Sequence, residues 1–346
     1  MRRTRHSFVL VMMAIAALAP AATATAGAAS EHPARSPGRT VTAHIRVKAT
    51  IPVGSQPIGI ATDPRANRIY VANADSGTVS VISGRTDTVV ATIRVGRVPA
   101  GVAADPRTDT IYVTNEGSRT VSVISGRTNT VLATIHVGRF PYGVATDPRT
   151  NRTYVANADS GTVSVISGRT NTVVATIRVG RFPAGVATDP RTDAIYVTMD
   201  SNKVPVISGR TDKVVARVRV RFRATEAVAT DPRTNTIYVT NPRGKAVAVI
   251  SGRRNTVVAT VHGGFQAAFG VATDPLTDTI YLADGGDEAW VISGRTDTVV
   301  ATVRVGGGPV GVATDPQAKA IYVTNNFDNT VTVLVSCWSR AAARCR

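Results

Sequence analysis

Acidic side chains that could bind a ligand stand in two irregular stretches of the sequence. In the first, Asp284, Asp287 and Glu288 lie close together and are separated by glycines. In the second, Glu226 follows a run that is rich in arginine. Carboxylates in such loops can hold a cation or a polar ligand, although the first stretch lacks the full ligand spacing of a calcium loop. We therefore predict ligand binding at these residues; the alternative is that turns here tolerate any polar residue.

Arginines form the other candidate binding surface. Arg217, Arg219, Arg221 and Arg223 follow one another closely in the stretch just before Glu226. Such a cluster raises the local concentration of polyanions and binds them in a salt-sensitive way. The alternative is that charged side chains only protect an exposed sheet edge from pairing with other molecules.

Histidine and serine chemistry is disfavoured. Of the five histidines, His136 and His262 fall in runs that we assign to outer strands, and His32 and His44 precede the repeats described next. A histidine metal cluster or a serine triad would lack its residues, and no Gly-x-Ser-x-Gly elbow is present. We therefore assign no catalytic residue, no metal and no cofactor, and we expect a protein that is not an enzyme.

The elements that position these residues are copies of one repeat. An Asp-Pro pair recurs at Asp63, Asp105, Asp147, Asp189, Asp231, Asp274 and Asp315, with a spacing of 42 residues four times and then of 43 and 41. Each copy holds four short runs rich in Val, Ile, Thr and Tyr, separated by turn residues. This pattern predicts an all-β protein, a seven-bladed β-propeller of four-stranded antiparallel blades.

Several details of the ring follow from the repeat. The last copy lacks its fourth run, and Arg46 to Gly54 resembles that run, so we predict that this N-terminal strand completes the last blade. Seven of the eight tyrosines share one position in the second run, which indicates packing between blades. Pro205 predicts a local bulge in its strand. The loops between second and third strands form an acidic mouth, where we also place Glu226.

The two ends of the chain have different compositions. Residues 1–26 have the basic, apolar and small-residue regions of a secretory signal peptide, and residues 27–38 have the composition of a flexible lead-in. The propeller is assigned to residues 39–336 and a C-terminal tail to 337–346. In an oxidising compartment the tail cysteines, Cys337 and Cys345, favour a disulfide over two free thiols. No second apolar run could span a membrane.

A family resemblance rests on the second run of the repeat. Tyr112, Val113, Thr114 and Asn115 spell YVTN, as do Tyr322 to Asn325, and runs such as TVSVISG and VVATIRVG accompany them. Over residues 46–336 the chain resembles the YVTN family of β-propeller repeat proteins. The resemblance implies a secreted or surface-exposed propeller related to surface-layer proteins and, more distantly, to lactonase-like propellers. It implies no settled activity, because loops decide function on this fold.

We expect a monomeric binding scaffold that is secreted or on the cell surface, associated with the envelope through anionic polymers or other proteins. One alternative is a lactonase-like hydrolase or lyase with its site at the mouth of blades four to six. Another is an extracellular nucleic-acid binder, although Phe222 is the main aromatic residue among the arginines that could stack on a base.

Overall fold

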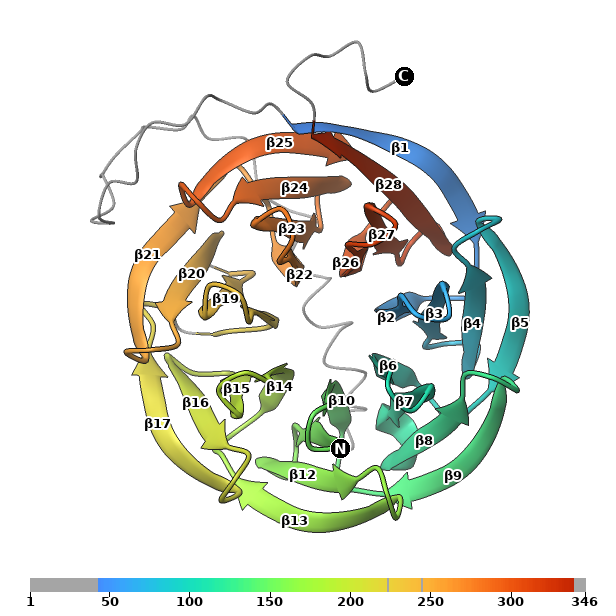
Figure 1. Ribbon diagram of the computed structural model, residues 1–346, viewed down its shortest axis with the longest axis vertical. Helices are drawn as coiled ribbons and strands as arrows, with labels where there is room; N and C mark the ends of the chain where they lie inside the picture. Colours follow the sequence, from blue (N-terminus) through green and yellow to red (C-terminus); the bar gives the residue numbers. More distant parts are fainter. Residues whose placement is uncertain (1–42, 223, 244, 339–346) are drawn as a thin grey trace, which may run out of the picture.

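The chain folds into a closed ring of seven four-stranded antiparallel sheets around a central axis (Figure 1). The computed structural model describes residues 43–338 apart from 223 and 244, and side chains from 45 to 336 within that range. The predicted seven-bladed β-propeller is confirmed. Residues 1–42, which include the predicted signal peptide and the whole of the predicted lead-in, lie outside the described residues.

Blades one to six run from an inner strand to an outer strand in chain order, and blade seven takes β1 as its outer strand. Blade one contains β2 (Pro57–Asp63), β3 (Arg68–Asn73), β4 (Thr78–Ser83) and β5 (Thr88–Arg94), and blade two contains β6 (Pro99–Asp105), β7 (Thr110–Asn115), β8 (Thr120–Ser125) and β9 (Thr130–His136). Blade three contains β10 (Pro141–Asp147), β11 (Arg152–Asn157), β12 (Thr162–Ser167) and β13 (Thr172–Arg178), and blade four contains β14 (Pro183–Asp189), β15 (Ala194–Met199), β16 (Lys203–Ser208) and β17 (Lys213–Arg219). Blade five contains β18 (Val228–Asp231), β19 (Thr236–Asn241), β20 (Ala246–Ser251) and β21 (Thr256–His262), and blade six contains β22 (Ala268–Asp274), β23 (Thr279–Asp284), β24 (Glu288–Ser293) and β25 (Thr298–Arg304). Blade seven contains β26 (Pro309–Asp315), β27 (Ala320–Asn325), β28 (Thr330–Trp338) and β1 (Ala43–Pro52), and a short 3-10 helix, η1 (Glu116–Ser118), follows β7.

The first strand of the chain closes the ring. β1 pairs antiparallel with β28, from Ala43 opposite Trp338 to Pro52 opposite Thr330. The predicted closure is therefore confirmed, with the strand beginning three residues earlier than Arg46. β28 also continues two residues past Ser336, the predicted end of the propeller, because the lengthened β1 supplies pairing partners there.

Neighbouring blades pack through the second and third strands, which are buried on both faces. The repeated tyrosines are the largest of these buried side chains. Tyr70 of blade one, for example, packs in one cluster with Val102 and Ile111 of blade two. The predicted packing role of these tyrosines is confirmed, and the outer strands expose alternate residues because nothing covers their outer side.

Threonine hydroxyls also join the blades. At the residue before each repeated aspartate, the hydroxyl donates to the backbone carbonyl of the same position in the preceding blade. These donors, at 2.7 to 2.8 Å from their acceptors, are Thr62, Thr146, Thr188, Thr230, Thr273 and Thr314. Blade two has Ala104 at this position and makes no such bond to blade one.

Pro205 shortens a sheet ladder instead of creating a bulge of its own. β15 and β16 pair only from Ala194 to Tyr196, whereas β11 and β12 pair along their full length. Proline has no N–H to donate to a neighbouring strand. The register irregularity between β16 and β17 falls at Val206 and Ile207, where the other complete blades also have it. The prediction that Pro205 causes a bulge was therefore wrong, because blades without this proline have the same irregularity.

The two faces of the ring carry different loops. The hairpin face carries the loops between first and second strands and between third and fourth strands. The mouth face carries the loops between second and third strands. Because the end of each fourth strand pairs with the start of the third, as Arg94 does with Thr78, the connections between blades also lie on the mouth face. Their arginines therefore share a face with the acidic loops, and the predicted acidic mouth has to be corrected to a mixed one.

Candidate binding sites

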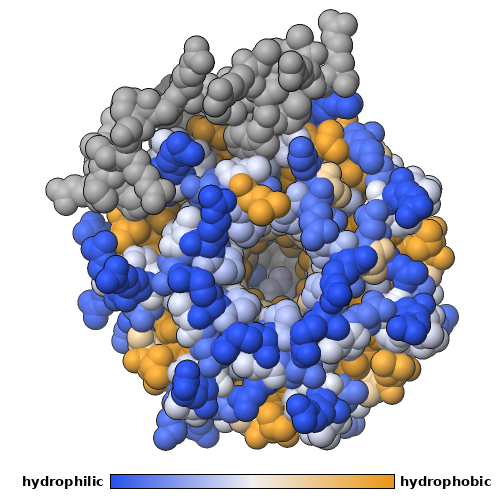
Figure 2. All heavy atoms as spheres, in the orientation of Figure 1, coloured by the Kyte–Doolittle hydropathy of each residue, from blue (hydrophilic) through white to orange (hydrophobic). Residues whose placement is uncertain are grey.

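The inner strands surround a central channel whose opening is ringed by hydrophilic residues (Figure 2). The channel contains a cavity of about 180 Å³. Its wall is built from three successive positions at the start of the inner strands, as at Ile58, Gly59 and Ile60. The first of these positions differs most among the blades. The seven occupants of this position are Ile58, Ala100, Tyr142, Ala184, Glu226, Phe269 and Val310, and all of them except Ala184 line the cavity. In six of the seven blades a glycine follows, where a Cβ would collide with a backbone carbonyl of the next blade, as Gly143 would with that of Ala184; blade five has Ala227 there.

Glu226, which the sequence analysis placed at the channel mouth, lies in the wall of the channel. Only 8% of the residue is exposed. Its backbone carbonyl accepts a hydrogen bond from the Thr198 hydroxyl at 2.6 Å and one from Gly185 N–H at 3.1 Å, which fixes its place beside blade four. Burial raises the pKa of its carboxyl to about 7; nearby Arg243 opposes this shift and Asp200 adds to it. Near neutral pH the carboxyl is therefore poised between its charged and neutral forms.

Tyr142 is the one tyrosine outside the packing series, and it faces Glu226 in the channel. Its hydroxyl and the Glu226 carboxyl interact by hydrogen bonding, which lowers the pKa of Glu226. The pKa of the Tyr142 hydroxyl lies well above its ordinary value, first because of burial and then because of the charges of Glu226 and Glu116. The tyrosine is therefore a neutral hydrogen-bonding group at any physiological pH.

Glu116 is a site residue that the sequence analysis did not select. It is only 4% exposed, and its Oε2 atom has no hydrogen-bond partner among the described residues. It lines a small recess together with Tyr142, Ala158 and Ala184. Burial, and then the charge of Asp159, raises the pKa of its carboxyl to about 7. The available signal was its position after a YVTN asparagine, where the first and third copies have alanine.

In the acidic stretch of blade six, Asp284 and Glu288 stand opposite each other across the β23–β24 hairpin. Asp284 stands where other copies have the YVTN asparagine; its carboxylate accepts hydrogen bonds from the backbone of Gln266 and Ala267. Burial raises its pKa, and these two bonds oppose the rise. Asp287 accepts a bond from Gly308 N–H at 3.3 Å, and Glu288 begins β24. None of the three carboxylates lines the channel cavity.

Exposed arginines alternate with buried valines at the end of the outer strand of blade four. Arg217, Arg219 and Arg221 are exposed, while the valines between them are buried. The Arg217 guanidinium donates to the Val179 carbonyl of the preceding blade at 2.7 Å. Arg223 lies outside the described residues. Phe222 is buried in the core cluster between blades four and five, so its expected availability for stacking on a base was wrong.

The outer-strand arginines take part in none of the ion pairs found between described residues. These pairs join Lys48 to Asp87, Arg149 to Asp193, and Arg152 to Asp212. Arginines at the ends of outer strands, which take part in none of these pairs, are Arg94, Arg178, Arg219 and Arg304. Their charge is therefore available to solvent and to ligands.

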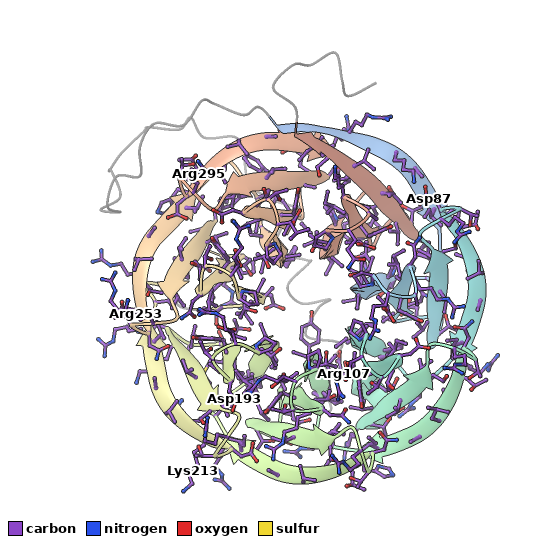
Figure 3. The ribbon with its side chains drawn as sticks, viewed as in Figure 1. Asp87, Arg107, Asp193, Lys213, Arg253 and Arg295 are labelled. Carbon is purple, nitrogen blue, oxygen red and sulfur yellow. The ribbon has the colours of Figure 1, made fainter. Side chains whose placement is uncertain are left out.

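On the hairpin face, arginine and aspartate have mainly structural partners. Asp105 accepts a hydrogen bond from Arg107 N–H within its own turn, and the Arg107 side chain donates to the Pro148 carbonyl of the next blade. Arg253 and Arg295 belong to loops toward the outer edge of the ring, and Arg107 lies nearer the axis (Figure 3). Turn formation thus accounts for more of these residues than ion pairing does.

The residues that could bind a metal ion or form a disulfide are the histidines, the cysteines and the clustered acids. Within residues 45–336, no group of three His, Cys, Asp or Glu side chains is arranged to hold a metal ion. His136 and His262 are exposed ends of outer strands. Cys345 lies outside the described residues, and only the backbone of Cys337 is described, so the predicted disulfide stays a prediction.

No described helix is long and apolar enough to cross a bilayer.

Comparisons with known proteins identify the fold. No protein-family model and no curated protein matches the sequence. Among solved structures, the chain is similar to hydrazine synthase of Kuenenia stuttgartiensis, with a TM-score of 0.76 and 22% identity over 82% of this chain and 96% of that chain. In total 1844 solved chains match, so the architecture is widespread and does not select a function. The likeness supports the β-propeller fold of this chain.

Proposed function

We propose that this protein is a secreted or cell-surface propeller of the YVTN type that binds anionic polymers through the arginines of its outer strands. The observation that carries the proposal is the exposure of these arginines without carboxylate partners among the described residues. Polyanions such as wall polymers and acidic glycans supply the missing negative charge. Residues 1–26, which have the composition of a secretory signal, support a location outside the cytoplasm.

The geometry of blade four favours repeated anionic groups. Arg217 and Arg219 stand two residues apart on the same side of β17, about 7 Å from each other along the strand. Arg219 pairs with Lys203 of β16, which adds a further exposed cation. Buried Val218 and Val220 anchor this edge, so binding costs little ordering of the backbone. A polymer with closely spaced phosphates or carboxylates can contact several of these groups together.

The hydrolase or lyase alternative has less support. It requires converging groups at the mouth of blades four to six, and of the predicted acids there only Glu226 lines the channel cavity. The nucleic-acid alternative loses Phe222 as a stacking residue because that side chain is buried. Both alternatives therefore keep fewer of their predicted residues than polyanion binding does.

A salt-gradient experiment tests the proposal with a matched control. The triple variant Arg217→Ala, Arg219→Ala, Arg221→Ala removes three charges from blade four, and Arg253→Ala, Arg254→Ala, Arg295→Ala removes three from the hairpin face. On immobilised polyphosphate we expect only the first variant to elute at clearly lower salt than the wild type. Equal shifts for both variants would show that net charge alone causes retention and would overturn the proposal. Immobilised single-stranded DNA, if retained more strongly than polyphosphate, would favour the nucleic-acid alternative.

A further inference from the structure

The channel holds features that polyanion binding does not use. Glu226 of blade five and Tyr142 of blade three bring a carboxyl and a hydroxyl to a cavity whose other lining side chains are apolar. Glu116 of blade two brings a second carboxyl to the small recess that Tyr142 also lines. The fold does not require an acid at the Glu226 position, since the same position holds Ala184 and Val310 in other blades of this chain. Placing a carboxylate in an apolar environment costs free energy unless a partner compensates it. A bound cation is such a partner.

We infer that the channel binds a small organic ammonium ion with an apolar body, held at its charged end by Glu226 and Tyr142. The ammonium group would donate to the Glu226 carboxylate and the Tyr142 hydroxyl. Glu116, whose Oε2 atom lacks a partner among the described residues, adds negative charge beside Tyr142. The apolar body would contact Phe269 and the aliphatic wall, and the rings of Tyr142 and Phe269 also favour a cation.

The size of the cavity restricts the ligand. A volume of about 180 Å³ is well below that of pockets for drug-sized molecules. An apolar cavity of roughly 150 Å³ is sufficient for benzene. The site therefore fits one aromatic ring or a short aliphatic chain with one amino group, and a metal ion is disfavoured because the described residues form no three-ligand cluster.

The charges around the site favour a cation over an anion. Asp200 is near Glu226, and Asp159 is near Glu116; both carboxylates add to the negative potential. Arg243 is the cation that acts on Glu226, and it is exposed on the mouth face outside the cavity lining. Binding should strengthen as the pH rises through 7, because the carboxyls lose their protons while an aliphatic ammonium ion stays charged.

Three probes of nearly equal size test the inference on the full chain: benzylamine, benzyl alcohol and benzoate. By calorimetry at pH 8, we expect benzylamine to bind about tenfold or more tightly than either of the others, because only it gains charge-assisted bonds. Lowering the pH to 6 should weaken benzylamine binding and leave benzyl alcohol binding unchanged. Equal or stronger binding of benzoate, or no saturable binding of benzylamine at millimolar concentration, would overturn the inference.

Two variants locate the site. Glu226→Gln should weaken benzylamine binding about tenfold and leave benzyl alcohol within about twofold of the wild type. Glu288→Gln, which removes an acid outside the cavity lining, is the matched control and should change neither probe. If both variants weaken benzylamine equally, the ligand does not use the channel. The polyphosphate experiment on the arginine variants is independent of these outcomes.

Discussion

Tyr112 and Tyr142 are tyrosines in neighbouring blades, and they serve the molecule differently. Tyr112 occupies the repeated YVTN position and is buried with Val144, Val155 and Ile166 of the next blade. Tyr142 occupies a position where the copies differ, and its side chain lines the channel. Residues common to the copies therefore build the ring, whereas residues that depart from the repeat supply the polar groups of the channel.

The same contrast separates the carboxylates. The Asp63 side chain accepts hydrogen bonds from Arg65 and Ala66 N–H in its turn, and equivalent aspartates do the same in other blades. Glu116 and Glu226 stand at positions that vary among the copies, and both are buried. Within the described part of the chain, no backbone N–H donates to either carboxyl. The repeated aspartates thus stabilise turns, whereas Glu116 and Glu226 leave their carboxyls available for a ligand.

Truncating each tyrosine should give the largest difference. Tyr112→Ala removes a fully buried ring and should lower the free energy of unfolding by about 3–5 kcal/mol. Tyr142→Ala should cost less than about 1.5 kcal/mol, because the ring borders a cavity instead of the core. Chemical denaturation of both variants measures this. Similar losses would mean that Tyr142 is also a packing residue.

Replacing the buried acid should stabilise the protein at alkaline pH. Burial raises the pKa of Glu226 from 4.5 to about 7, so the folded state binds more protons than the unfolded state between these values. The free energy of unfolding should therefore fall as the pH rises from 5 to 8, by roughly 3 kcal/mol for this group. Glu226→Gln should reduce that fall when unfolding is followed across the pH range. An unchanged pH profile would contradict the burial of a titrating carboxyl here.

The smallest expected effect belongs to the threonine bonds between blades. Thr188→Val keeps the shape of the side chain and removes its hydrogen bond to the Thr146 carbonyl, which should cost about 1 kcal/mol. Thr188→Ser, the matched control, should retain most of the bond. Denaturation midpoints distinguish the two variants, and equal stability of Thr188→Val and wild type would remove these hydroxyls from the account of ring closure.

The sequence was sufficient for the ring and insufficient for the channel. Repeat spacing, the alternation of valines and the missing last strand predicted the blades and the closure by β1, because each depends on local pattern. Glu226 was found because it breaks the repeat. Glu116 and Tyr142 were passed over because their proximity depends on how three blades meet at the axis. The acids at Asp284, Asp287 and Glu288 lie outside the channel cavity, and backbone N–H groups of Ala267 and Gly308 donate to the first two.

Titration of the Glu226 carboxyl carbon by NMR, with and without benzylamine, tests the central claim most directly. The account predicts an apparent pKa of about 7 in the free protein and a lower value when the amine is bound, since a cation favours the charged carboxylate. Titration near 4.5, or an apparent pKa that benzylamine leaves unchanged, would contradict the claim that residues departing from the repeat form a binding site in the channel.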